Sequence, residues 1–315
     1  MHRMMMLVSL VLSLSFTGIA ANAAEKPKLA VSLPGSVEFF MVQRKGMDKA
    51  AGELGVELVY ADAEWDPGKQ LNQVEDFVAQ KVDMILLCSS DNMALMPAVD
   101  LCRDAGIPLI AFTNVLGPNA DGSLDGIVSF IGINDLTLGK MMGEMAEKLL
   151  GDKAEASIVH IEGTPGTSAQ RMRTEGFNSV LAKHPGWKIV YSQAITGWTK
   201  EGALSAVEAF LRTKQNVDLI SCQWHAAASA AAEALAEAGV DKKVFVTGLE
   251  YSRETVPYIK SGQIDMTTDA SISGMGYKAI ETAAKHLKGE KVPALIEIMP
   301  IIVDKANVGT VTPEL

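Results

Sequence analysis

Residues 82–112 read VDMILLCSSDNMALMPAVDLCRDAGIPLIAF, and this stretch decides the fold. An apolar run at 82–88 is followed by apolar residues at helical spacing over 93–105, and Gly106 ends that helix. A second apolar run then occupies 107–112. Two buried strands joined by a helix form a βαβ unit, which requires parallel strands with helices packed on the faces of the sheet.

The same alternation extends from this unit in both directions. Before it, strands are expected at 28–33 and 56–61, with helices at 39–54 and from Pro67 to residue 80. After a looser stretch at 117–126, a short strand at 127–131 and a helix near 136–150 open a second series. Its strands are expected near 157–161, 188–191, 217–222, 244–247 and 264–268, and its helices near 168–183, 200–212, 226–238 and 252–260. We therefore predict an α/β protein with two doubly wound parallel-sheet lobes. A helix at 274–287 and a strand at 295–299 follow the second series and belong to neither lobe by this pattern.

Length and composition exclude several classes of protein. A chain of 315 residues should hold about two domains. Its 48% hydrophobic and 21% charged residues are ordinary for a globular protein, which excludes disorder and coiled coils. The net charge of −10 argues against a nucleic-acid partner, because phosphate neutralisation needs clustered lysine and arginine.

The first residues have the layout of a secretory signal peptide. Arg3 precedes a mostly apolar run at 4–19, and Ala21 and Ala23 place small residues before a cut after Ala23. An uncleaved membrane anchor is the alternative. The first cysteine is Cys88, so no lipid-anchored cysteine can lie at the cut, and we expect a free periplasmic protein.

Three cysteines, Cys88, Cys102 and Cys222, cannot all pair within one chain. We favour buried thiols at strand ends over a Cys88–Cys102 disulfide. No cysteine and histidine cluster suggests a metal, and no cofactor is expected. The acidic stretch at 121–126 resembles the start of a calcium loop, but residue 132 is glycine where glutamate is needed, so we prefer a surface turn.

Ligands of parallel α/β sheets bind outside the carboxyl ends of the strands, so the strand-to-helix junctions are the places to look for a site. No junction carries the GxSxG, HExxH or phosphate-loop pattern of an enzyme, and a non-enzymatic role follows. The junctions are 34–40, 88–92, 113–115, 163–171, 197–200, 223–225 and 248–252.

Two of these junctions carry family motifs. SLPGSVEFF at 32–40 and GTPGTSAQRMRTEGF at 163–177 resemble segments of ribose-type sugar-binding proteins, which are type I periplasmic substrate-binding proteins of ABC importers. The resemblance implies two lobes joined by a three-segment hinge, with a small ligand between them. It also implies a monomer that docks on an ABC permease in the inner membrane. The implied lobes are 24–132 plus 270–299 (N-terminal lobe) and 133–269 plus 300–315 (C-terminal lobe). With these bounds, the helix at 274–287 and the strand at 295–299 belong to the N-terminal lobe and its sheet.

The resemblance also implies binding residues. The family's aromatic pair falls on Phe39 and Phe40, which can stack on the apolar face of a sugar ring. Its cleft arginine falls on Arg171, in the first turn of a helix capped at Thr167 or Ser168, and its acid falls on Glu250.

Other positions depart from the family pattern and argue against ribose itself. Thr113 and Asn114 stand where an Asp-Arg pair is usual, and Trp224 and His225 replace an Asn-Asp pair. Asp269 lies beside the position of a usual glutamine, and Trp198 matches the cleft aromatic one position late. With Ser89 at its junction, the predicted ligand-binding residues are Phe39, Phe40, Ser89, Thr113, Asn114, Arg171, Trp198, Trp224, His225, Glu250 and Asp269.

Several of these residues allow two interpretations. Trp198 and Trp224 either stack on a ligand or pack in the core and between lobes, and His225 either bonds a ligand or caps a helix. The tryptophans with Glu38, Glu250 and Asp269 could also form a cage for a cation, which Arg171 would oppose. We predict a receptor for a sugar or sugar alcohol; the alternatives are a component that presents its ligand to a membrane sensor, and a receptor for an amine-type ligand.

Overall fold

The structure is a computed structural model that describes residues 26–315, so the expected leader at 1–23 and the cut after Ala23 lie outside the described residues. The βαβ unit is present as β3 (Met84–Leu87), α3 (Pro97–Ala105) and β4 (Leu109–Phe112), with β3 and β4 parallel. The helix begins at Pro97 and not at residue 93, which corrects the prediction. The Asp91 carboxylate accepts the N–H groups of Met93 and Ala94 and so holds the preceding residues in a turn.

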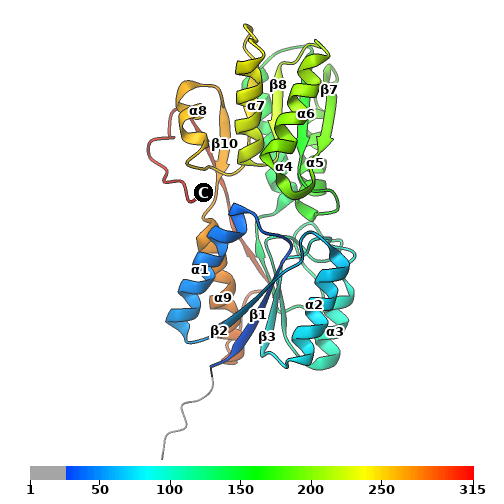
Figure 1. The fold of residues 1–315 in the computed structure, drawn as a ribbon, viewed down its shortest axis with the longest axis vertical. Coiled ribbons are helices and arrows are strands. Elements are labelled where there is room, and N and C mark those ends of the chain that lie inside the picture. The colour runs from blue at the N-terminus through cyan, green and yellow to red at the C-terminus, as the bar shows by residue number, and fades with distance from the viewer. Residues whose placement is uncertain (1–25) are drawn as a thin grey trace, which may run out of the picture.

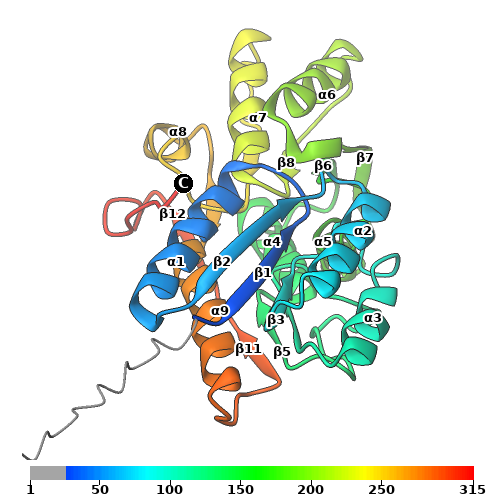
Figure 2. The ribbon, with the colours of Figure 1, turned by 60° about the horizontal axis from the view of Figure 1, so that its bottom comes forward.

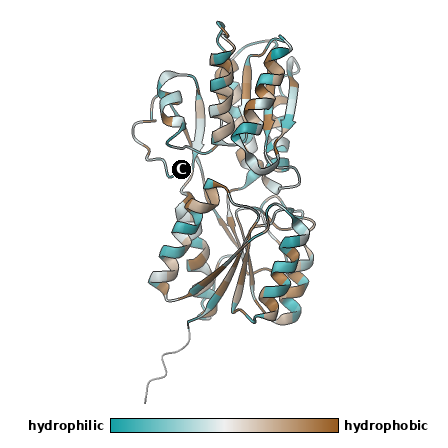
Figure 3. Ribbon diagram, in the orientation of Figure 1, coloured by the Kyte–Doolittle hydropathy of each residue, from teal (hydrophilic) through white to brown (hydrophobic). Residues whose placement is uncertain are grey.

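The first sheet has the strand order β11-β5-β4-β3-β1-β2, and every pairing in it is parallel. Helices α1 and α9 cover one face, and α2 and α3 cover the other (Figures 1 and 2). Because both faces are covered, the central strands are apolar throughout, and they appear as a hydrophobic band in Figure 3. The remaining elements of this sheet are β1 (Lys28–Leu33), α1 (Glu38–Leu54), β2 (Glu57–Asp62), α2 (Pro67–Ala79), β5 (Ser129–Gly132), α9 (Ile272–Leu287) and β11 (Leu295–Glu297).

The second sheet has the order β12-β10-β9-β8-β6-β7 and is parallel except at β12. The sequence did not predict β12 (Ile301–Asp304), a short edge strand that runs antiparallel to β10 just after Pro300. The other elements are α4 (Asp135–Leu150), β6 (Ala156–Glu162), α5 (Ser168–Leu181), β7 (Trp187–Ala194), η1 (Thr196–Trp198), α6 (Lys200–Arg212), β8 (Leu219–Cys222), α7 (His225–Glu237), β9 (Phe245–Thr247), α8 (Thr255–Ser261) and β10 (Met266–Asp269).

The chain crosses between the two sheets three times: after β5, after β10 and after β11. Figure 1 shows the two sheets in separate lobes, one above the other, with the crossings between them. This arrangement confirms the predicted fold class of two α/β lobes. The lobe boundaries stated above remain a prediction.

All three cysteines are buried and free, so the Cys88–Cys102 disulfide does not form in this structure. Burial raises the pKa of the Cys102 thiol to about 12, and it raises the pKa of Cys88 and of Cys222 further. These thiols therefore behave as small apolar side chains. Within residues 26–315, no helix combines the length and the apolar character that crossing a membrane would require.

Candidate functional site

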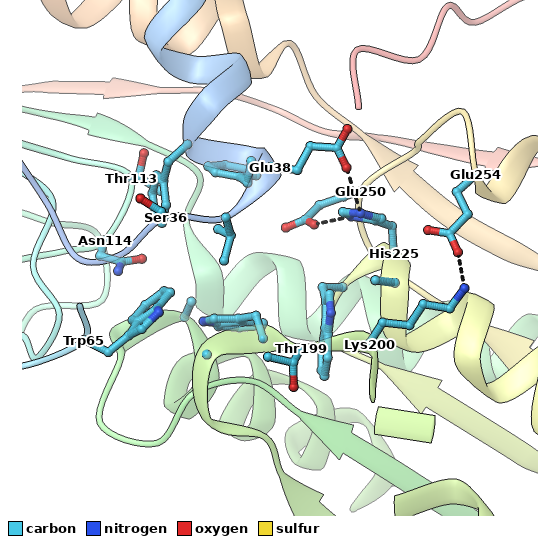
Figure 4. A pocket seen from close by; sticks show the side chains of 18 of the residues that line it. Ser36, Glu38, Trp65, Thr113, Asn114, Thr199, Lys200, His225, Glu250 and Glu254 are labelled. Carbon is cyan, nitrogen blue, oxygen red and sulfur yellow. Dashed lines mark hydrogen bonds and ion pairs between the residues drawn. The ribbon is translucent and has the colours of Figure 1, made fainter. Parts of the chain in front are cut away.

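A cavity of about 360 Å³ lies between the two lobes, where the carboxyl ends of both sheets face each other (Figure 4). The first lobe lines it with loops that follow β1, β2 and β4, and the second with segments that follow β6, β7, β8 and β9. This is the position that the topology of parallel sheets predicts for a ligand. Eight of the eleven predicted residues line the cavity, namely Phe39, Phe40, Thr113, Asn114, Trp198, Trp224, His225 and Glu250.

Three aromatic rings form the wall of the first lobe. Phe39 and Phe40 meet edge to face with ring centroids 5.4 Å apart, and Trp65 lies 6.3 Å from Phe40. The indole of Trp65 covers Gly35, where a Cβ atom would lie 2.4 Å from the indole nitrogen. Trp65 was not predicted. Its signal was available, because it is an aromatic residue at the junction after β2.

Two tryptophans form the facing wall. The rings of Trp198 and Trp224 are nearly perpendicular, at 87° and 5.4 Å between centroids. A Cβ atom at Gly163 would lie 1.9 Å from the Trp198 ring, so this glycine is required for the ring's position. Both tryptophans pack against the core of the second lobe and also line the cavity, so stacking on a ligand remains a prediction that core packing does not exclude.

The Trp224 indole has an unused hydrogen-bond donor. Trp224 is 3% exposed, and its Nε1 has no hydrogen-bond partner among the described residues. A buried donor without an acceptor costs free energy, so this indole nitrogen is a polar group that the second lobe leaves unsatisfied.

The arginine of the cavity is Arg173, which corrects the assignment of that role to Arg171. Arg171 is exposed on α5 and bonds the side chain of Asn92 in the other lobe, away from the cavity wall. Arg173 is buried and lines the cavity. Its Nε lies 2.9 Å from the Asp135 carboxylate, and one NH group donates to the Gln223 carbonyl at 2.8 Å. The motif Arg-x-x-Gly-Phe, counted back from Gly176 and Phe177, would have selected Arg173.

His225 joins acids from both lobes. Its Nδ1 lies 3.0 Å from the Glu250 carboxylate, and its Nε2 lies 3.9 Å from the Glu38 carboxylate of α1 (Figure 4). Burial alone would lower the pKa of His225, but the hydrogen bond to Glu250 and the charges of Glu250, Glu38 and Glu254 raise it. The side chain makes no capping bond to α7, so the capping interpretation of His225 is wrong.

Lys200 also lines the cavity, but acids of its own lobe hold its ammonium group. Its Nζ lies 2.8 Å from Glu233 and 2.5 Å from Glu254. Burial would lower the pKa of Lys200, whereas these two bonds raise it, so the lysine stays charged.

Thr113 and Asn114 line the cavity, but their side chains are already bonded. Gln43 donates to the Thr113 hydroxyl at 2.7 Å, and Asn114 donates to the Ser89 carbonyl at 2.8 Å. Ser89 itself is buried behind the wall, where its hydroxyl donates to the Val115 carbonyl. The predicted role of Ser89 at the ligand is therefore replaced by a role in supporting Asn114.

Asp269 lies outside the main cavity. It borders a smaller cavity of about 20 Å³ beside the crossings, which Phe39, Arg173 and Glu250 also border. Burial, together with the charge of Glu314, raises the pKa of Asp269. Asp269 is therefore placed to act on the hinge side of the site rather than on its wall.

The described residues contain no group of three or more histidine, cysteine or acidic side chains placed to hold a metal ion. At the predicted surface turn, the Asp121 carboxylate accepts hydrogen bonds from the N–H and the hydroxyl of Ser123. The carboxylate is used within the turn itself.

Two parallel-sheet lobes, three crossings and a ligand-sized cavity between facing strand ends define a type I periplasmic binding protein. The chain belongs to this family: residues 29–291 match the model of the periplasmic binding protein domain. The family consists of solute-binding proteins, which agrees with the predicted non-enzymatic role.

Named relatives cover nearly the whole chain. The ribose import binding protein of Haemophilus influenzae is 31% identical over 95% of this chain and 98% of its own. A putative rhizopine-binding protein of Rhizobium meliloti is 30% identical over 86% and 88%. A solved solute-binding protein of Bacillus halodurans with bound myo-inositol is 26% identical and superposes with a TM-score of 0.83, covering 91% of this chain and 98% of that one.

Proposed function

We propose that this protein is a periplasmic receptor that encloses a small polyhydroxylated ligand, a sugar or a cyclic or linear polyol, and delivers it to an ABC importer. The observation that carries the proposal is the cavity of about 360 Å³, whose aromatic faces and polar groups come from both lobes. Aromatic faces suit the apolar side of a sugar ring, and the arginine and the acids suit its hydroxyl groups.

Relatives support this ligand class and this transport role. Their names and bound ligands include ribose, myo-inositol and, in a solute-binding protein of Actinobacillus succinogenes that is 27% identical, D-allose. The replacement of the family's Asp-Arg and Asn-Asp pairs by Thr113-Asn114 and Trp224-His225 favours a ligand other than ribose.

The mechanism that we propose is closure of the two lobes about the three crossings. A ligand that touches both walls stabilises the closed arrangement by the contacts it makes only there. The same proposal includes a monomer, a leader cut near Ala23, and lobes of 24–132 plus 270–299 and 133–269 plus 300–315.

A thermal-shift screen of the purified protein against pentoses, hexoses, inositols and linear polyols tests the proposal. A ligand at a hundredfold excess over its Kd should raise the free energy of unfolding by about 2.7 kcal/mol. We expect at least one member of this panel to raise Tm, and the Trp198→Ala variant to lose that rise. A panel in which no compound raises Tm would contradict the proposal.

A further inference from the structure

The charges on the cavity wall are unequal. Four glutamates line it, Glu38, Glu201, Glu250 and Glu254, against one arginine and one lysine. A neutral polyol needs hydrogen-bond donors and acceptors but no net charge, whereas a net negative wall attracts a cation. The Glu38 side chain is 61% exposed in this structure, so its charge is held in contact with solvent until a ligand arrives.

The two permanent cations are already neutralised before a ligand arrives. Arg173 pairs with buried Asp135, and Lys200 bonds both Glu233 and Glu254. The presence of an arginine was the argument against a cationic ligand, and the pairing with Asp135 removes it. A protonated His225 bonds Glu250 and lies 3.9 Å from Glu38, so this one imidazolium is shared by two carboxylates. Among the described ion pairs, Glu38 has no lysine or arginine partner and Glu201 has no partner.

The carboxylates face a wall of aromatic rings. Trp198 and Trp224 meet edge to face opposite the Phe39, Phe40 and Trp65 group. Ring faces attract a cation, most strongly in tryptophan and where water is excluded. An aromatic wall with an excess of carboxylates beside it recognises a protonated amine, and the same carboxylates can accept hydrogen bonds from hydroxyl groups of that ligand.

We propose that the ligand of this receptor carries a protonated amine on its polyol or sugar ring, and that Glu38 supplies the charge that selects it. The inference rests on the proposed function and narrows its ligand class. Glu38 enters from α1 of the first lobe, so closure brings this carboxylate onto a ligand that already contacts the tryptophans of the second. The cost of the excess negative charge is then offset by the ligand itself.

Matched pairs of compounds test the proposal by calorimetry at mildly acidic pH and low salt. The pairs are D-glucose with D-glucosamine, and myo-inositol with an amino-deoxy-inositol, so that each pair differs in one hydroxyl or ammonium group. In at least one pair we expect the amine to bind about tenfold more tightly than its parent, and the preference to shrink as salt is added.

Two variants locate the selecting charge. Glu38→Gln should reduce the ratio of amine to parent affinity by about fivefold. Glu75→Gln, which removes the same charge from the exposed side of α2, should leave the ratio unchanged. Because the ratio is compared within one variant, a general weakening of lobe closure cancels.

Each outcome decides between the two proposals. A parent that binds as tightly as its amine in every pair overturns the amine inference and leaves the receptor for polyols intact. No binding by either member of any pair overturns the amine inference, and the thermal-shift panel described above then decides the receptor for polyols separately. An unchanged ratio in Glu38→Gln overturns the selecting role of Glu38.

Discussion

The Nε2 of His225, at the start of α7 in one lobe, lies 3.9 Å from the carboxylate of Glu38, in the first turn of α1 in the other. This contact spans the cleft. Its strength depends on the protonation of His225, and Glu250, Glu38 and Glu254 raise the pKa of that imidazole against the opposite effect of burial.

Stability should therefore depend on pH through His225. Because its pKa is higher in the folded than in the unfolded state, its stabilising contribution is complete below the unfolded value, about 6.5, and is lost as pH rises through the folded value. We expect the Tm difference between the wild-type protein and His225→Gln to be largest at acidic pH and to shrink towards alkaline pH, from a contribution of about 1 kcal/mol. A difference that is constant with pH, measured by calorimetry in parallel buffers, would exclude this role.

Gly163→Ala should disturb the site through Trp198. A methyl group at this position would lie 1.9 Å from the indole, so the ring must leave its place on the wall. We expect about tenfold weaker binding of the strongest ligand from the screen, or about 1.4 kcal/mol. Gly52→Ala is the matched control, because nothing lies within 4 Å of its added methyl group, and it should keep the wild-type affinity.

Replacing each of the two arginines of α5 should change the free energy of unfolding by very different amounts. Arg173→Ala leaves Asp135 buried without its partner and should lower the free energy of unfolding by about 3–5 kcal/mol. Arg171→Ala removes an exposed residue, and we expect a loss below about 0.5 kcal/mol. Since Arg171 bonds Asn92 across the cleft, its loss should weaken binding only a few-fold. Equal losses in urea unfolding would contradict the assignment of the two residues.

The cysteines should be unreactive in the native protein. Burial blocks a reagent from reaching each thiol, and the raised pKa keeps each thiol protonated, whereas the thiolate is the reactive form. We expect no thiol to react rapidly with an aromatic disulfide reagent in native buffer, and all three to react in denaturant without reductant. A single reactive thiol in denaturant would show that two of the three cysteines are paired and would contradict this prediction.

Local sequence patterns predicted the fold well, because alternation of apolar runs and amphipathic segments depends on neighbours along the chain. The start of α3 was wrong because the Asp91 turn competes with helix over 93–96, and β12 was missed because it pairs only with a distant strand. At the site, the resemblance placed the cleft arginine on Arg171, whereas the burial of Arg173 depends on Asp135, which is 38 residues away in the chain.

The pairings on the cavity wall also join residues that are far apart in the chain. No local pattern shows that Lys200 is neutralised by Glu233 and Glu254, or that Trp65 covers Gly35. These contacts join segments of one lobe that are far apart in the chain and meet only when the lobe folds, so the junctions could be predicted but their partners could not.

The aromatic walls also give the protein an optical signal of its own. Of its four tryptophans, Trp65, Trp198 and Trp224 line the cavity from both lobes, and Trp187 lies elsewhere, stacked on His184 with ring centroids 3.9 Å apart. Intrinsic fluorescence should therefore change when a ligand displaces water from three indoles, over a background from the fourth that stays constant. Closure could be followed in real time by stopped flow without a dye, and Trp187→Phe would remove the background.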